Sequence, residues 1–425
     1  MPRSLAANVL EDILHRRKSF DNSFSDHGGR AKLEVRDRAF AYNLVATTLR
    51  RLGQIDDLIS QCLDRPLPKK ARGAQTILRL GVAQLIFMNV SDHAAVDTSV
   101  NLAQDRKQGP YKKLINAVLR RLGREGASLL SEQTPAVLNT PAWLWDSWIT
   151  AYGDQAAHHI AESHLQPPPL DISVNSSTET WVADLDGHLL PTGSIRITDH
   201  SGVEKLPGFK EGAWWVQDAA AALPVRLFRE LAGQRIADLC AAPGGKTAQL
   251  ASAGARVTAI DRSEKRMLVL QENMDRLSLE TTCVVGDATQ WRPDEPLDGV
   301  LIDAPCSATG TIRRHPDIPW IKSPADVGGV AKTQRALLEA SIEMVRPGGT
   351  IVFATCSLQP EEGPEAISGF LDSCTDVVCD PIGEKEMPVL PDCITSDGHL
   401  RTLPCFWPEE GGMDGFFAAR LTRIH

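Results

Sequence analysis

The first third of the chain carries apolar side chains at the spacing of helices and shows no strand-like alternation. The clearest case is 111–124, where Tyr, Leu, Ile and Val recur at intervals of three and four residues and form one apolar face. Segments 44–58 and 77–88 show the same period, and the Pro- and Lys-rich stretch 66–73 separates them. The pattern predicts an all-α domain, which we place at 1–139.

The middle of the chain has a mixed pattern. The segment 140–164 has helical spacing, and the QPPP at 166–169 would end a helix because proline cannot continue one. Two strand-like runs follow, LDISVN at 170–175 and SIRITD at 194–199. This order predicts a small α+β subdomain over 140–215.

From residue 216 onward, short apolar runs alternate with helical segments such as 264–277 and 330–345. Repeated strand–turn–helix units predict a parallel, doubly wound sheet that is covered on both faces. We therefore expect an α/β Rossmann-like domain over 216–425, which makes the chain a multidomain protein. The predicted strands are 235–239, 256–261, 282–286, 298–303, 350–355 and 416–421.

Charge is distributed unevenly along the chain. The formal net charge is −9, which taken alone argues against a nucleic-acid partner. Residues 1–125, however, hold 22 Lys and Arg against 13 Asp and Glu, whereas the remainder holds 23 against 41. A basic module on an acidic body is typical of a dedicated nucleic-acid-binding domain, although a solvated basic face is the plainer reading.

Composition places the chain among cytoplasmic proteins. Charged residues make up 23%, and no apolar run approaches the roughly 18 residues of a membrane span. The first residues read as a helix and lack the apolar core of a secretion signal. The nine cysteines include no CxxC pair, so we expect reduced thiols and no metal site.

A glycine-rich turn follows the first strand of the α/β domain. The sequence CAAPGGKT at 240–247 matches the end of a phosphate-binding loop, GxxxxGK[ST], but Cys240 stands where that loop needs its first glycine. A nucleotide triphosphatase is therefore disfavoured. Glycines at such a turn instead let the backbone approach a nucleoside cofactor closely.

Three aspartates lie at the ends of successive strands of the predicted sheet: Asp261 and Asp303 end their strands, and Asp287 follows the strand between them. The carboxyl ends of parallel strands meet at one edge, so these side chains should converge on one crevice. There Asp261 could accept hydrogen bonds from a ribose and Asp287 from an adenine amino group. Any one of them could be merely a helix N-cap, but three in this order favour a cofactor site.

Two cysteines, Cys306 and Cys356, also follow strands of this sheet. A single buried cysteine is usually a packing residue, but these two share the edge of the cofactor acids. Methylation of C5 of a pyrimidine requires a thiolate that adds to C6 and so makes C5 nucleophilic. Asp303 is placed to hydrogen-bond or protonate N3 of the ring, which would require a raised pKa if it donates a proton.

Four motifs give the chain a family resemblance: CAAPGGKT (240–247), DAPCSATGTIRRHPDIPW (303–320), VFATCS (352–357) and DGFF (414–417). They resemble the RsmB/Sun/Fmu branch of the RNA 5-methylcytosine methyltransferases, in which a NusB-like RNA-binding domain precedes the methyltransferase core. The resemblance implies methylation of a cytidine in small-subunit ribosomal RNA, with Cys356 as nucleophile and Cys306 assisting product release. DNA cytosine methyltransferases use a Pro-Cys nucleophile, so motif position alone leaves the two roles open.

The resemblance also implies S-adenosylmethionine as cofactor. The implied contacts are Cys240, Ala241, Ala242, Pro243, Gly244, Gly245, Lys246, Asp261, Asp287 and Asp303.

Candidate RNA contacts come from two places. Lys113, Arg120 and Arg124 share a basic face of the helix predicted at 111–124. Arg313 and Arg314, beside the predicted active site, are the second candidates. We expect the protein to be a monomer and its partner to be ribosomal RNA.

Two positions depart from the family pattern. Ser173 stands where the family commonly has Arg, which could weaken an RNA contact, and Gly363 stands where relatives often have Asn.

Several other functions stay open. A transfer-RNA 5-methylcytosine methyltransferase would share the same core. A non-catalytic antitermination factor would explain residues 1–125 but not the cysteine motifs, and no large target-recognition region of a DNA methyltransferase is evident.

Overall fold

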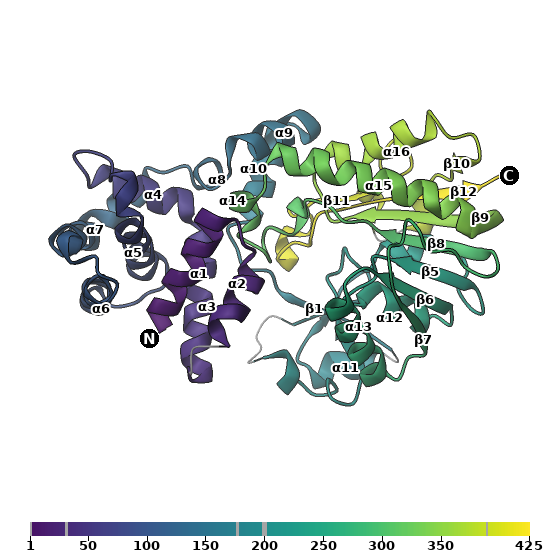
Figure 1. Ribbon diagram of the computed structural model, residues 1–425, viewed down its shortest axis with the longest axis horizontal. Coiled ribbons are helices and arrows are strands. Elements are labelled where there is room, and N and C mark those ends of the chain that lie inside the picture. The colour runs from purple at the N-terminus through teal and green to yellow at the C-terminus, as the bar shows by residue number, and fades with distance from the viewer. Residues whose placement is uncertain (1, 30–32, 176–177, 198–201, 388–389) are drawn as a thin grey trace. The chain divides into compact units, whose positions relative to one another are not determined.

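The computed structural model describes residues 2–29, 33–175, 178–197, 202–387 and 390–425. The chain forms two compact units. The helical unit comprises 1–167 and 312–323, and the sheet unit comprises 168–311 and 324–425 (Figure 1). Among the described residues, no helix is long and apolar enough to cross a membrane.

The main sheet of the sheet unit has the strand order β10-β12-β9-β8-β5-β6-β7, with β11 paired to β12. The five strands from β7 to β9 are parallel, whereas β12 runs antiparallel to β9. This confirms the predicted doubly wound α/β domain and adds an antiparallel edge. The strands are β5 (Arg235–Leu239), β6 (Arg256–Asp261), β7 (Thr281–Val285), β8 (Leu297–Asp303), β9 (Val345–Thr355), β10 (Val377–Cys379), β11 (Leu400–Thr402) and β12 (Phe416–Arg423).

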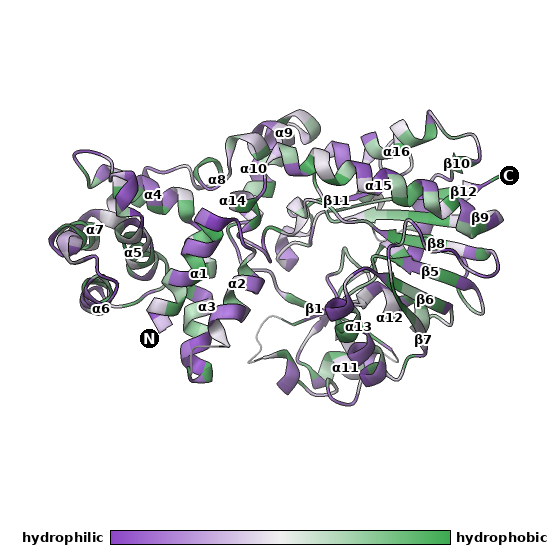
Figure 2. Ribbon diagram, in the orientation of Figure 1, coloured by the Kyte–Doolittle hydropathy of each residue, from purple (hydrophilic) through white to green (hydrophobic). Residues whose placement is uncertain are grey.

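Helices cover both faces of this sheet because its strands send side chains alternately to each side. In β12, Phe417, Ala419 and Leu421 pack in the cluster that includes α15, while Phe416 and Ala418 belong to the opposite cluster with α12. Figure 2 shows hydrophobic colour along the central strands and alternating colours along helices such as α15. The helices are α12 (Gly245–Ser252), α13 (Glu264–Leu277), α15 (Pro324–Met344) and α16 (Pro364–Leu371).

A second, smaller sheet precedes the main one and has the order β2-β3-β1-β4. It confirms a small α+β region. A buried ion pair crosses it, because the Arg196 guanidinium binds both carboxylate oxygens of Asp171 at 2.7 Å. Its elements are β1 (Leu170–Val174), α11 (Thr178–Asp184), β2 (His188–Leu189), β3 (Ile195–Ile197) and β4 (Trp214–Val216). Residues 198 and 199 of the predicted second strand lie outside the described residues.

The helical unit confirms the predicted all-α fold and is longer than expected. Residues 140–167, assigned from sequence to the α+β region, belong to it. The helix expected over 140–164 is two helices, because Gly153 between them has a φ of +83°, which favours glycine. The helices are α1 (Pro2–Arg16), α2 (Phe20–Gly28), α3 (Val35–Arg50), α4 (Leu52–Gln61), α5 (Arg72–Val82), α6 (Asp92–Asp105), α7 (Lys112–Ser131), α8 (Pro135–Leu138), α9 (Ala142–Tyr152), α10 (Asp154–Ser163) and α14 (Ile318–Ile321).

The segment 312–323, which contains α14, packs in the helical unit although it lies inside the α/β sequence region. The indole nitrogen of Trp320 donates to the carbonyl of Leu49 at 3.0 Å, and the Asp317 carboxylate accepts from the backbone N–H of Phe20 at 2.9 Å. The latter satisfies an N–H at the start of α2 that has no partner within the helix. The continuous α/β domain expected over 216–425 is therefore interrupted.

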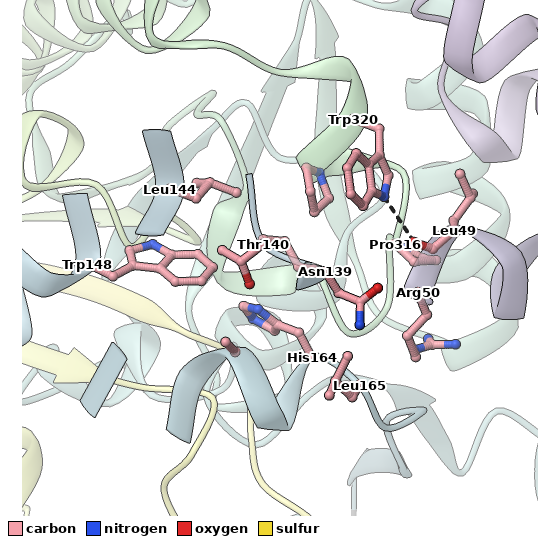
Figure 3. A pocket seen from close by; sticks show the side chains of 13 residues that line it. Leu49, Arg50, Asn139, Thr140, Leu144, Trp148, His164, Leu165, Pro316 and Trp320 are labelled. Carbon is pink, nitrogen blue, oxygen red and sulfur yellow. Dashed lines mark hydrogen bonds between the residues drawn. The ribbon is translucent and has the colours of Figure 1, made fainter. Parts of the chain in front are cut away.

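A small cavity in the helical unit is lined by side chains from α3, α9, α10 and the 312–323 segment (Figure 3). Its volume of about 20 Å³ is close to that of one water molecule. Among the residues that line it, three buried nitrogens have no hydrogen-bond partner in the described part of the chain: Arg50 Nε, Trp148 Nε1 and His164 Nε2. Burial, followed by the charges of Arg313 and Arg50, lowers the pKa of His164 to about 3. The folded protein therefore holds this imidazole neutral.

We predict that His164 makes the helical unit sensitive to acid. An unfolded histidine binds a proton below about pH 6.5, so stability is lost between that pH and about pH 3. The loss from this group should reach about 2 kcal/mol at pH 5. Urea unfolding at pH 7.5 and pH 5.0 checks this, since His164→Phe should lose less stability on acidification than the wild type. Equal losses in the two proteins would contradict the prediction.

Candidate functional site

The candidate site lies where the strand order of the main sheet reverses. From β5, the chain first moves to β6 and β7 on one side and then to β8 and β9 on the other. Because loops diverge at such a point, a crevice forms beyond the carboxyl ends of β5 and β8. The turn after β5 uses a φ of +63° at Cys240 and +102° at Gly244. A Cβ on Gly244 would lie 2.9 Å from the Leu270 side chain, so glycine lets this turn pack on α13.

Asp261 and Asp287 line one cavity of about 370 Å³ together with Cys240, Pro305 and residues of α15. Asp261 is 2% exposed and accepts from the backbone N–H groups of Ala242 at 3.2 Å and Ser263 at 2.9 Å. It therefore joins the turn after β5 to the end of β6. The structure thus brings together three of the residues predicted to bind a cofactor.

The exposed Asp287 is held by a threonine two residues on. It accepts from the backbone N–H of Thr289 at 2.9 Å and from its hydroxyl at 2.7 Å. These bonds, with the side-chain bond as the larger cause, lower the pKa of Asp287. Its carboxylate is therefore ionised and can still accept a further hydrogen bond from the cavity.

Asp303 lies outside the lining of that cavity and pairs with Lys246, whose ammonium nitrogen is 2.9 Å from the carboxylate. Burial alone would lower the pKa of Lys246, but the Asp303 carboxylate outweighs it and raises that pKa. The ammonium also lies 5.0 Å from the centre of the Phe416 ring. Lys246, predicted to contact the cofactor, thus forms an ion pair with Asp303, which was predicted to interact with N3 of the cytosine.

Cys306 and Cys356 are brought together by neighbouring parallel strands. Asp303 at the end of β8 pairs in register with Ala354 near the end of β9. The loops that follow place the two sulfur atoms 3.4 Å apart. The hydrogen bond with Cys306, burial and the Asp303 carboxylate raise the pKa of Cys356 well above its usual value. The resting site therefore holds Cys356 as a thiol.

Cys240, the third cysteine near this edge, has a different environment. Burial and the surrounding carboxylates raise its pKa to about 12. The resting structure therefore holds Cys240, like Cys356, as a thiol. It lines the same cavity as Asp261 and Asp287, where it was predicted to contact the cofactor.

Comparison with known proteins agrees with this geometry. Residues 227–422 match the family model of 16S rRNA methyltransferase RsmB/F, and residues 1–124 match the NusB family. Ribosomal RNA small subunit methyltransferase B of Salmonella arizonae is 36% identical, covering 99% of this chain and 98% of that protein. The same protein of Klebsiella pneumoniae is 35% identical over the same shares. The chain belongs to this methyltransferase family.

Solved structures agree with the fold of this family member. The structure titled "Crystal Structure of PH0851" has a TM-score of 0.76 at 21% identity, over 100% of this chain and 99% of the other. A methyltransferase homolog from Pyrococcus horikoshii has a TM-score of 0.55 at 25% identity, over 66% of this chain and 94% of the other.

The predicted RNA contacts differ in accessibility. Lys113, Arg120 and Arg124 are exposed on α7, and the last two line an open groove of about 450 Å³ between α6 and α7. The prediction for Arg313 is wrong in this structure, since its side chain is 1% exposed. Arg314 is half-buried and, like Arg313, belongs to the helical unit. The segment leaves the sheet unit at residue 312, which its sequence motif does not reveal.

The two departures from the family pattern have local partners. The Ser173 hydroxyl donates to the side chain of Gln217 at 2.8 Å. A Cβ on Gly363 would lie 2.8 Å from the guanidinium of Arg401. The latter side chain donates to the carbonyl of Ser357, directly after Cys356, at 2.6 Å.

Sequence reasoning missed one buried acid at this site. Glu362 is fully buried and accepts hydrogen bonds from the residues that follow both cysteines. The signal for it in the sequence was its place in the Pro-Glu-Glu-Gly motif at 360–363, beside the departure from the family pattern at Gly363.

Proposed function

We propose that this family member methylates C5 of a cytidine in small-subunit ribosomal RNA through a covalent bond between Cys356 and C6 of the base. The observation that carries the proposal is the 3.4 Å separation of the Cys306 and Cys356 sulfurs beside the Lys246–Asp303 pair. A pyrimidine bound there would meet a nucleophile, a second thiol and a charged pair in one place. The names of the related proteins support ribosomal RNA as substrate.

S-adenosylmethionine fits the cavity that Asp261 and Asp287 line. Its volume of about 370 Å³ lies within the range of small-molecule sites. Asp261 would hold the ribose hydroxyls, and the exposed Asp287 would accept from the adenine amino group. When bound, this cofactor supplies the methyl group that C5 receives.

The chain's own residues would carry the remaining steps. The Cys356 proton passes to Asp303 as the sulfur bonds to C6, and Asp303 donates that proton to N3, which makes C5 electron-rich. The Lys246 ammonium stabilises the carboxylate that this transfer restores. After methylation, N3 returns its proton to Asp303. Cys306, its own proton lost to solvent, takes the proton from C5, and the C6–sulfur bond breaks to release the Cys356 thiolate. Cys356 then takes back the proton that Asp303 holds, which restores both groups.

The two thiols should differ in what their loss leaves behind. Cys356→Ala should abolish both turnover and adduct, because no sulfur can bond to C6. Cys306→Ala should retain a protein–RNA adduct that survives denaturing electrophoresis, because release is blocked. Radiolabelled 16S ribosomal RNA is the substrate, with transfer RNA as the comparison. An adduct in the Cys356 variant and none in the Cys306 variant would reverse the assignment.

Asp261 should contribute to cofactor affinity. Losing a hydrogen bond to a charged group costs about 1.5–3 kcal/mol, which corresponds to roughly tenfold or more in Kd. Calorimetry with S-adenosylhomocysteine should show this weakening in Asp261→Ala. The matched control is Glu264→Ala, an exposed acid in the first turn of α13 that should bind normally. An unchanged Kd for the Asp261 variant would refute this cofactor site.

The exposed basic face of α7 should contribute to RNA affinity. Each phosphate contact on a single strand adds about −0.7 to the slope of log affinity against log salt concentration. Changing Lys113, Arg120 and Arg124 together to Ala should therefore flatten that slope. The matched control changes the exposed Arg65, Lys69 and Lys70, which removes the same charge from another surface. Binding measured by fluorescence anisotropy with a wild-type slope for the α7 variant would contradict this assignment.

A further inference from the structure

A closed cluster of polar side chains lies beneath the two cysteine loops. Its members are Ser307, Thr309, Ser357 and Glu362, each at most 1% exposed. Ser307 follows Cys306 and Ser357 follows Cys356, so the cluster contains the next residue of each loop.

The Glu362 carboxylate joins the two loops directly. It accepts from the backbone N–H of Ser307 at 2.8 Å and from the Ser307 hydroxyl at 2.5 Å. It also accepts from the Ser357 hydroxyl. Two loops whose cysteines are 50 residues apart in sequence thus share one acceptor. These bonds are sheltered from water, so leaving any of their donors without an acceptor would be costly.

Other bonds hold the cluster in place. The Thr309 hydroxyl lies 3.2 Å from that of Ser357 and accepts from the backbone N–H of Leu358 at 2.9 Å. The Thr355 hydroxyl, at the end of β9, donates to the backbone carbonyl of Glu362 at 3.0 Å. The acid is therefore anchored to the sheet, and its carboxylate cannot shift without breaking several buried bonds.

We propose that Glu362 is a positioning residue that sets the separation of the Cys306 and Cys356 sulfurs for adduct release. This inference rests on the proposed function. Glu362 is not assigned contact with the base, and it acts through the loop backbones. Two of its three donors belong to Ser307, so the loop of Cys306, the release residue, depends on it more than the loop of Cys356 does.

The charge of Glu362 is less important than its shape in this role. Burial raises the pKa of this carboxyl, although its serine donors oppose the rise. A glutamine has nearly the same shape and keeps one oxygen that can accept from the Ser307 N–H. The Ser307 and Ser357 hydroxyls lie 3.1 Å apart and can bond to each other when one acceptor is lost.

The first experiment compares Glu362→Ala, Glu362→Gln and the exposed control Glu361→Ala in the full-length protein. We expect kcat on 16S ribosomal RNA to fall on the order of 100-fold in Glu362→Ala, because a displaced thiol near the base is costly. The Kd for S-adenosylhomocysteine and the KM for RNA should stay within about twofold, since the loss is confined to the chemical steps. The adduct should accumulate as in Cys306→Ala. Glu362→Gln should recover most of the lost turnover, and Glu361→Ala should match the wild type.

A second measurement reports the sulfur separation without the methylation chemistry. Diamide oxidises two neighbouring thiols to a disulfide and is itself reduced to the hydrazine. Mass spectrometry would follow the rate at which Cys306 and Cys356 are linked. We expect a rate at least about tenfold lower in Glu362→Ala, in line with the strong dependence of such reactions on proximity, and a near wild-type rate in Glu362→Gln.

The outcomes separate this inference from the proposed function. Absence of an adduct in Cys306→Ala refutes the adduct mechanism, while a slowed disulfide in Glu362→Ala would still support positioning by Glu362. Wild-type turnover and disulfide formation in Glu362→Ala overturn the positioning role even if Cys306→Ala accumulates adduct. Equal defects in Glu362→Gln and Glu362→Ala, with normal cofactor binding in both, also overturn it, because charge and not position would then be responsible.

Discussion

The close approach of two sulfur atoms is the constraint around which the sheet unit is built. Cys306 and Cys356 can lie 3.4 Å apart because β8 and β9 are adjacent, parallel and paired so that Asp303 is opposite Ala354. A shift of one residue in that register would turn every side chain of a strand to the other face. The buried alternation of the strands therefore stabilises the fold and also sets the chemistry at its edge.

The same edge concentrates ionisable groups that would be costly in an ordinary core. Asp238 is fully buried beneath the cofactor turn, and burial raises its pKa to about 7 even though Thr247 donates to it at 2.6 Å. Lys246 is kept charged by Asp303, and Cys356 is kept protonated by its neighbour. Perturbed groups of this kind cluster at functional sites, where stability is given up for reactivity. Because the resting thiol is protonated, the proposed mechanism requires Cys356 to lose its proton as its sulfur bonds to the base.

Regular periodic segments were predictable from the sequence. The strand Arg235–Leu239 and the helix Glu264–Leu277 have the predicted bounds, because hydrophobic period and flanking turns agree there. The helix predicted over 44–58 was less successful, since it breaks between α3 and α4 at Arg51, two residues before Gly53. Gly153 marks the break between α9 and α10, but the helical spacing on both sides of it predicted one continuous helix.

Tertiary partners account for what the sequence could not predict. Segment 312–323 follows the Cys306 motif without a break, yet its bonds to α2 and α3 place it in the helical unit. Arg313 looked like a surface cation and is buried because of that packing. Glu362 looked like one of two equivalent glutamates, and only the folded chain distinguishes it from the exposed Glu361. Local pattern predicts the candidate reactive residues, whereas the contacts that hold them in place come from distant segments.

The most direct test of the account is to identify the sulfur that bonds to the base. RNA containing 5-fluorocytidine should trap the wild-type protein after methyl transfer, because fluorine at C5 cannot leave as a proton. Trypsin would place Cys356 in the peptide 336–385 and Cys306 in the peptide 277–313, so mass spectrometry can separate them. The account predicts the nucleotide on Cys356. A nucleotide on Cys306, or no covalent complex at all, would contradict it.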